Sequence, residues 1–216
     1  PEEAFRLETL RRQILDLYSS WGYDLVIPPL IEYLDSLLVG SSHDLDLHTF
    51  KITDQLTGRM MGLRADITPQ VARIDAHCLA QKGQDSQHLP VRLFYSDTVA
   101  HTRPRGLLAS RIPIRIGAEF FGHKGVGCDV ELICLMHDTV RLAEINEIHI
   151  VLGHVGIFRS LVNESALSAE VETDLFDALQ RKAYDEIDLL LEQHVADQAI
   201  RKMIFELARL SGDESV

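Results

Sequence analysis

The sequence predicts an α+β protein in which a largely antiparallel sheet is flanked by helices. Three observations favour this class. Segments with strand and helix patterns follow one another in an irregular order, without the steady alternation that builds a parallel sheet. Two strand patterns, 91–99 and 112–121, are long enough to pair with each other. From Leu175 onward the apolar residues recur only at helical spacing.

The N-terminal part predicts a helix, a strand, a hairpin and a second helix. Apolar residues at steps of three and four indicate an amphipathic helix that ends at Gly22, and they are Leu7, Leu10, Ile14, Leu17 and Trp21. Residues 25–27 are expected as a strand cut off by two prolines, which lack a backbone donor. Segments 50–53 and 60–63 indicate the arms of a hairpin. Thr68-Pro69 then predicts the start of a helix that runs to about Leu79.

The middle of the chain holds the two best strand patterns and the connection 101–110 between them. A connection this long between paired strands is more often functional than decorative. Residues 128–143 predict a helix and 149–152 a strand. We place a domain boundary near Asn163, with a core over 1–163 and an acidic helical region over 164–216, where 13 acidic and 5 basic side chains occur.

Composition excludes several classes of function. The 216 residues are 46% hydrophobic and 25% charged, as in globular proteins. A net charge of -12 opposes attraction to phosphate backbones or anionic lipid, so no nucleic acid partner is expected. No apolar run approaches the roughly 20 residues that cross a bilayer, and the acidic N-terminus is unlike a secretory signal. These features predict a soluble, cytoplasmic protein without a membrane partner.

The cysteines and histidines indicate neither a metal site nor a disulfide framework. The three cysteines have no C-x-x-C spacing, and the ten histidines form no H-x-x-x-H pair with a carboxylate. No motif implies a cofactor.

Strict alternation over 112–120 separates an apolar face from a polar face. The apolar face consists of Ile112, Ile114, Ile116, Ala118 and Phe120. The polar face includes Arg111, Arg115 and Glu119. At roughly 3.3 Å per residue, Arg115 and Glu119 lie about 13 Å apart along the strand, so each needs a separate partner. A solvated face with cross-strand ion pairs and a polar platform for a ligand both fit this pattern.

Three groups of residues in this order form a longer pattern. They are Trp21-Gly22-Tyr23 through Pro28-Pro29-Leu30-Ile31-Glu32, then Leu63-Arg64-Ala65-Asp66-Ile67-Thr68, and then 91–122, which closes with Ile116-Gly117-Ala118-Glu119-Phe120-Phe121-Gly122. The pattern resembles the catalytic core of histidyl-tRNA synthetase over about the first 155 residues. This resemblance implies a class II aminoacyl-tRNA synthetase-like antiparallel sheet flanked by helices, with a C-terminal helical region. The chain does not reach a third class II motif.

The same resemblance marks a departure at the nucleotide site. The synthetase's second class II motif uses an Arg to neutralise the ATP α-phosphate and a Glu to hold the adenine amino group, and this sequence has His101 and Arg103 there. A weakly basic imidazole replaces a fixed cation, and a cation replaces an acceptor. The resemblance therefore implies that adenylate formation is lost.

Three segments, 44–51, 63–77 and 101–106, resemble a non-catalytic relative of that synthetase, the regulatory subunit of short-form ATP phosphoribosyltransferase. This resemblance implies a subunit that assembles with the short catalytic subunit, as a hetero-octamer in that family, and also with itself through the class II dimer surface. It further implies allosteric activation of the first step of histidine biosynthesis and a role in feedback by histidine. Members of that family are longer, so the chain is expected to end inside a helical insertion. The alternative is a catalytic-core fragment of a histidyl-tRNA synthetase or a related histidine-activating ligase.

The synthetase's amino-acid pocket implies a candidate histidine site. Asp66 stands where a Glu accepts from the substrate α-amino group, with Thr68 beside it, and Glu119 stands where a Glu meets the imidazole. Arg115 replaces a Gln near the α-amino group, so either it turns to the ligand carboxylate or to Asp66, or the site is altered. A helix cap before Thr68-Pro69 is the alternative interpretation of Asp66.

Arg103, Arg105 and Arg111 are candidates for contact with phosphate or with the partner subunit. A loop of solvated arginines is the alternative interpretation of Arg103 and Arg105.

Overall fold

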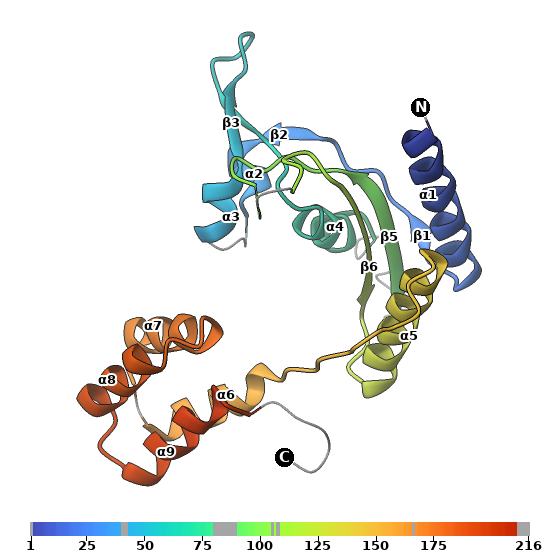
Figure 1. Cartoon of the computed structure of the whole chain (residues 1–216). Coiled ribbons are helices and arrows are strands. Elements are labelled where there is room, and N and C mark those ends of the chain that lie inside the picture. The colour runs from blue at the N-terminus through green and yellow to red at the C-terminus, as the bar shows by residue number, and fades with distance from the viewer. Residues whose placement is uncertain are drawn as a thin grey trace. The chain divides into compact units, whose positions relative to one another are not determined.

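The computed structural model describes residues 2–39, 43–79, 90–104, 106, 109–165 and 167–210. The chain forms two compact units, Pro1–Ile148 and His149–Val216 (Figure 1). This division lies earlier than the boundary expected at residue 163, because Phe158 and Val162 of helix α6 (Val155–Ser165) pack into the core of the second unit. Within the described ranges, no helix has both the length and the apolar sequence needed to span a bilayer.

A three-stranded sheet lies at the centre of the first unit, in the order β1 (Asp24–Leu25), β5 (Val91–Thr98) and β6 (Ile114–Phe121). β5 and β6 pair antiparallel, with Tyr95 opposite Gly117, which confirms the pairing expected for these two segments. β1 adds to β5 in parallel and is shorter than expected. Its pairing ends before Pro28 and Pro29, which have no N–H to donate.

Helices cover both faces of this sheet (Figure 1). α1 (Glu2–Ser20) and α5 (Val126–Leu142) pack on one face, against Phe94 and a stripe from β6. α4 (Thr68–Ile74) packs on the other face, where Ile67 and Val71 meet Leu93 and Tyr95. The chain continues from α4 into a π-helical turn, η1 (Asp75–Leu79), so the helix expected from Thr68 is present but changes its winding.

The apolar face of β6 is shorter than the alternation predicts. Ile116, Ala118 and Phe120 pack against the core shared with α1 and α5. Ile112 and Ile114 are 64% and 41% exposed. The core shared with α1 and α5 includes Ile116 but neither of these two residues. The polar face, with Arg115 and Glu119, is directed to the α4 side of the sheet.

A second small sheet precedes the site in the chain. Its strands are β2 (Ile31–Tyr33), β4 (Met60–Leu63) and β3 (Phe50–Thr53), paired antiparallel in this order. The expected hairpin is confirmed, and Gly58 turns it with a φ of 70°. Helices α2 (Leu34–Leu37) and α3 (His43–His48) lie between β2 and β3 in the chain. β4 ends directly before the Arg64–Asp66 turn.

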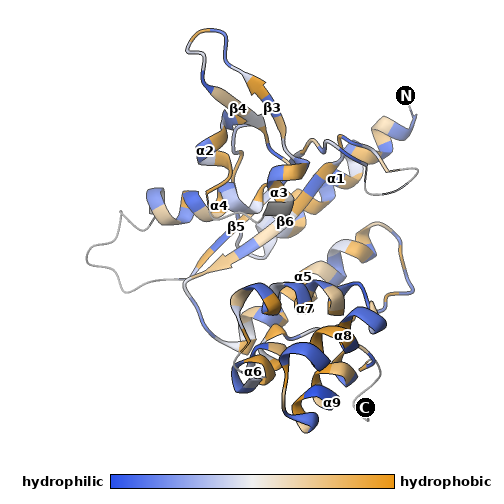
Figure 2. Cartoon of the chain, turned by 90° about the vertical axis from the view of Figure 1, so that its left-hand side faces the viewer, coloured by the Kyte–Doolittle hydropathy of each residue, from blue (hydrophilic) through white to orange (hydrophobic). Residues whose placement is uncertain are grey.

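All regular secondary structure in the described residues of the second unit is helical. It consists of α6, α7 (Ala169–Gln180), α8 (Tyr184–His194) and α9 (Gln198–Leu207), and its buried residues include Leu175, Ile187, Leu191 and Ile204. Figure 2 shows hydrophobic and hydrophilic bands along each of these helices. The strand predicted at 149–152 is wrong. Residues 149–152 pair with no described strand, and a short apolar segment without such a partner does not form one.

Candidate functional site

The turn that begins α4 places Asp66 at one end of the site. Because Pro69 has no N–H, the free donors of this helix start are the backbone groups of Ile67 and Thr68. Both donate to Asp66 Oδ1, at 2.7 Å and 3.4 Å. Asp66 therefore bonds the backbone just before α4, whose N-cap residue is Ile67. This bonding leaves Oδ2 without a hydrogen bond to any described residue.

Arg115 reaches across from β6 to the same carboxylate. Its Nε lies 3.3 Å from Asp66 Oδ1, and the two side chains are 35% and 23% exposed. Arg115 has no other ion pair and donates no hydrogen bond within the described part of the chain, so most of its guanidinium donors are available. Arg115 and Glu119 were expected to lie too far apart along the strand to pair, and the partner of Arg115 is Asp66.

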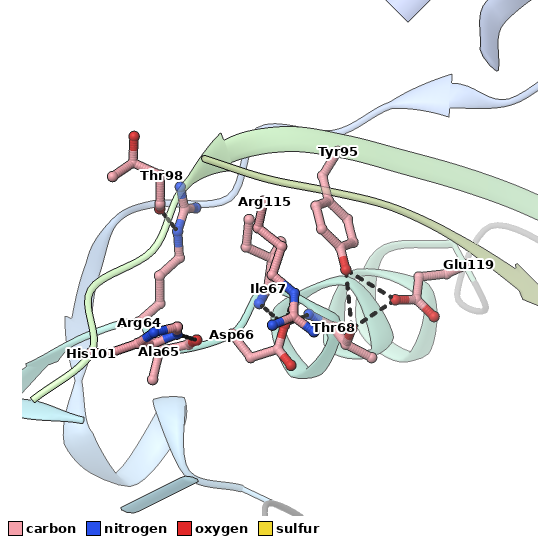
Figure 3. Close-up of polar contacts among 10 residues, drawn as sticks. All are labelled: Arg64, Ala65, Asp66, Ile67, Thr68, Tyr95, Thr98, His101, Arg115 and Glu119. Carbon is pink, nitrogen blue, oxygen red and sulfur yellow. Dashed lines mark hydrogen bonds and ion pairs between the residues drawn. The ribbon is translucent and has the colours of Figure 1, made fainter. Parts of the chain in front are cut away.

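Glu119 lies in a group of hydroxyls on the same face (Figure 3). Thr68 Oγ1 donates to Glu119 Oε1 at 2.8 Å, and Tyr95 Oη lies 3.1 Å from Thr68 Oγ1 and 3.5 Å from the same carboxylate oxygen. Burial raises the pKa of Glu119 and the Asp66 charge adds to this, while Thr68, Tyr95 and Arg115 oppose it. Oε2 accepts no hydrogen bond from a described residue and is free for a ligand donor.

Gly117 makes room for the Tyr95 ring, which the sequence interpretation missed. A Cβ at Gly117 would lie 2.3 Å from Tyr95 Oη and 2.5 Å from Cζ, so any larger residue displaces the ring. Burial raises the pKa of the Tyr95 phenol, which stays a neutral donor. A glycine on the polar face of one strand, with a tyrosine on its expected partner strand, is the signal that could have identified Tyr95.

At the other end of the β5–β6 pair, beyond Thr98, the His101 side chain is buried and bonded within the fold. His101 is 4% exposed, and its Nε2 lies 3.0 Å from the carbonyl oxygen of Ala65, next to Asp66 in the chain. Its backbone N–H donates to the Arg111 carbonyl at 2.8 Å, and Arg111 Nε donates to the His101 carbonyl at 3.1 Å. The His101 ring is therefore a structural group of the fold.

The two candidate loop arginines that the structure describes, Arg103 and Arg111, occupy different surroundings. Arg111 stacks over the Phe50 ring, with Cζ 4.9 Å from the centroid, besides its bond to His101. Arg103 is exposed and contacts no other described residue through an ion pair or hydrogen bond. Arg105 lies outside the described residues. Neither Arg103 nor Arg111 has an ion pair or hydrogen bond with Asp66 or Glu119.

Arg64 is a buried side chain that links the turn before Asp66 to the end of β5. It is 0% exposed, and it donates from Nε to the Thr98 carbonyl at 2.9 Å and from Nη1 to the Pro28 carbonyl at 2.6 Å. Its Nη2 lies 2.8 Å from Asp97 Oδ2. Because these partners come from the end of β5 and from the separate segment at Pro28, Arg64 holds the turn before Asp66 against β5.

These features define a class of protein: a class II aminoacyl-tRNA synthetase-like core in which one end of the β5–β6 pair keeps uncommitted polar atoms and the other end has His101 buried. The family model described as histidyl-tRNA synthetase matches residues 1–216, and the chain belongs to this family. Within it, the chain is 54% identical over its whole length to the ATP phosphoribosyltransferase regulatory subunit of Thioalkalivibrio sulfidiphilus and 52% identical to that of Ectopseudomonas mendocina. It covers 53% of each, so it spans about half the length of these curated relatives.

A solved structure agrees with this placement. It is from Bacillus halodurans and is described as an ATP phosphoribosyltransferase regulatory subunit/histidyl-tRNA synthetase. The TM-score is 0.81 and the sequence identity 25%, over 95% of this chain and 52% of that one. The class II synthetase-like fold expected from the sequence is confirmed.

Proposed function

We propose that this chain belongs to a non-catalytic regulatory subunit, which assembles with the short-form ATP phosphoribosyltransferase catalytic subunit in the cytoplasm and activates it allosterically. The names of the relatives at 50–54% identity support this function. The single structural observation behind it is the burial of His101 against the Ala65 carbonyl. An imidazole held there by the fold does not supply the fixed cation that the synthetase places at the ATP α-phosphate.

The alternative function, a histidine-activating ligase, makes a separate prediction. With His101 committed to the backbone and Arg103 in place of an adenine acceptor, histidine-dependent exchange of pyrophosphate into ATP should be undetectable. Robust exchange by the purified chain would restore the ligase function.

We assign the effector pocket of this subunit to Asp66, Thr68, Arg115 and Glu119, with Tyr95 as a fifth member. Histidine would place its α-amino group at Asp66 and its imidazole at Glu119, since both groups are donors to carboxylate oxygens. The uncommitted Oδ2 of Asp66 and Oε2 of Glu119 support this placement. Feedback then requires that histidine bind one conformation of the assembly more tightly than another, typically by about 1 to 3 kcal/mol.

Assembly involves two kinds of contact in this proposal. Self-association uses α1 and the Pro28-Pro29 region, as the class II resemblance implies, and the catalytic subunit completes a hetero-octamer. Arg103, Arg105 and Arg111 stay candidates for contact with that partner or with phosphate.

A chimera tests the proposal without depending on the length of this chain. Residues 1–216 replace the aligned half of the Thioalkalivibrio sulfidiphilus subunit, with which they share 54% identity. The chimera is mixed with that organism's short-form catalytic subunit, and turnover of ATP with phosphoribosyl pyrophosphate is measured with and without it. We expect complex formation and a rise in turnover. A folded chimera that neither binds nor activates the catalytic subunit would refute the function.

A further inference from the structure

We propose that Arg115 makes the pocket selective for ligands that have a carboxylate beside their amino group, by exchanging Asp66 for the ligand carboxylate. Because this is the pocket assigned above to the effector, the role rests on the proposed function. It adds the chemical feature that separates an α-amino acid from an amine of the same shape.

The contact between Arg115 and Asp66 is weak enough to exchange. It is a single approach of 3.3 Å from Nε, at side chains that are 35% and 23% exposed, and it lacks the parallel hydrogen bonds of a strong guanidinium–carboxylate pair. The two-nitrogen edge of the guanidinium donates to no described residue. Two nitrogens on that edge can donate parallel hydrogen bonds to the two oxygens of a ligand carboxylate. Such a bidentate pair is stronger than the existing single contact with Asp66.

The charges of the cluster define the rest of the ligand. Asp66 and Glu119 contribute two negative charges and Arg115 one positive charge, and both carboxylates keep one oxygen without a hydrogen-bond donor among the described residues. Thr68 and Tyr95 direct Glu119 toward the same space as Asp66 (Figure 3). A complementary ligand therefore has an anionic group for Arg115, an ammonium for Asp66 and an N–H donor for Glu119.

Arg115 also acts against the wrong ligand. An amine without a carboxylate brings its ammonium to Asp66, close to a guanidinium that gains no anionic partner from the ligand, and the two positive charges repel each other. With a carboxylate on the ligand, the same guanidinium gains a partner. The attractive and the repulsive contributions favour the same ligand, so this one side chain has a large effect on selectivity.

Calorimetric titration of the full chain with two probes separates these contributions. The probes are L-histidine and histamine, which lacks only the carboxylate. For the unchanged chain we expect histidine to bind about tenfold or more tightly than histamine, from the loss of one charge-assisted contact. Arg115→Gln should weaken histidine about tenfold and leave histamine unchanged or tighter, so that the preference disappears. Arg181→Gln, which removes an exposed Arg–Glu pair in the second unit, should change neither.

Each other outcome overturns the role. Tighter histidine binding in Arg115→Gln would mean that the guanidinium only repels the ammonium. Equal weakening of both probes would indicate a merely structural role, and absence of binding by the unchanged chain would remove the site itself. Activation of the catalytic subunit by the chimera is measured separately, so a failure of this selectivity leaves the proposed function standing.

Discussion

The two ends of the β5–β6 pair differ in what their polar side chains are left to bind. At one end Arg115 and Asp66 are 35% and 23% exposed, and both keep uncommitted atoms. At the other end His101 is 4% exposed and its ring nitrogen is held by the Ala65 carbonyl. One end can accept a ligand without breaking the fold, whereas the other cannot. Under the proposed function, this difference is what lets the fold bind an amino acid at the open end, around Asp66 and Arg115, without nucleotide chemistry at the closed end, around His101.

The closed end should depend most on Arg64. Arg64→Ala removes two hydrogen bonds to backbone carbonyls and the contact with Asp97, and it leaves a cavity where the side chain was 0% exposed. We expect the free energy of unfolding to fall by about 3 kcal/mol or more. Urea denaturation measures it. Arg181→Ala, which breaks an exposed pair with Glu186, should stay within about 1 kcal/mol of the unchanged chain. Similar losses in both variants would show that Arg64 does not hold the closed end.

The arrangement of Tyr95 and Glu119 at the open end should depend on the absence of a side chain at Gly117. Gly117→Ala places a methyl group 2.5 Å from Tyr95 Cζ, so the ring must move and the contact of the Tyr95 hydroxyl with Glu119 is lost. The expected destabilisation is about 1 to 3 kcal/mol, as for overpacked cores. In a Tyr95→Leu background the same change should be nearly neutral, because the ring is gone. Additive effects in this double-mutant cycle would contradict the proposed contact.

His101→Ala distinguishes a structural residue from a participant in the partner's chemistry. The variant loses the bond to Ala65 and some packing, which should lower the free energy of unfolding by about 1 to 2 kcal/mol. The rise in turnover that the chimera produces should persist at temperatures where the variant is folded. Complete loss of activation by a folded variant would mean that His101 acts directly in the partner's reaction.

Local patterns predicted the elements around the site but not all of its contacts. Alternation along 112–120 identified the face that presents Arg115 and Glu119, and the Thr68-Pro69 pair identified the start of α4. The roles of Tyr95 and Arg64 depend on residues 24 to 36 positions away in the chain, which no local pattern reports. The wrong strand at 149–152 has the same cause, since a short apolar segment becomes a strand only if another strand lies beside it.

The smallest expected effect is a pH dependence at the open end. Burial raises the pKa of Glu119 above its ordinary value of 4.5, and the Asp66 charge adds to this against the hydroxyls and Arg115. In the unfolded chain the carboxyl has its ordinary pKa, so acidification from neutral pH protonates the folded state first. Linkage then requires that this group's contribution to stability rise as the pH falls through the folded-state pKa, and that the gain be complete below 4.5.

A variant without the titrating group isolates this contribution from the other carboxyls, several of which have lowered pKa values and act in the opposite direction. Glu119→Gln keeps an oxygen that accepts from Thr68 but has no proton to take up. The free energy of unfolding of the unchanged chain, minus that of the variant, should therefore increase between neutral pH and pH 4.5. Urea denaturation at both pH values measures the difference. A difference that is constant or decreases on acidification would mean that Glu119 is solvated like an ordinary surface carboxylate. The contrast between the open and closed ends would then rest on His101 alone.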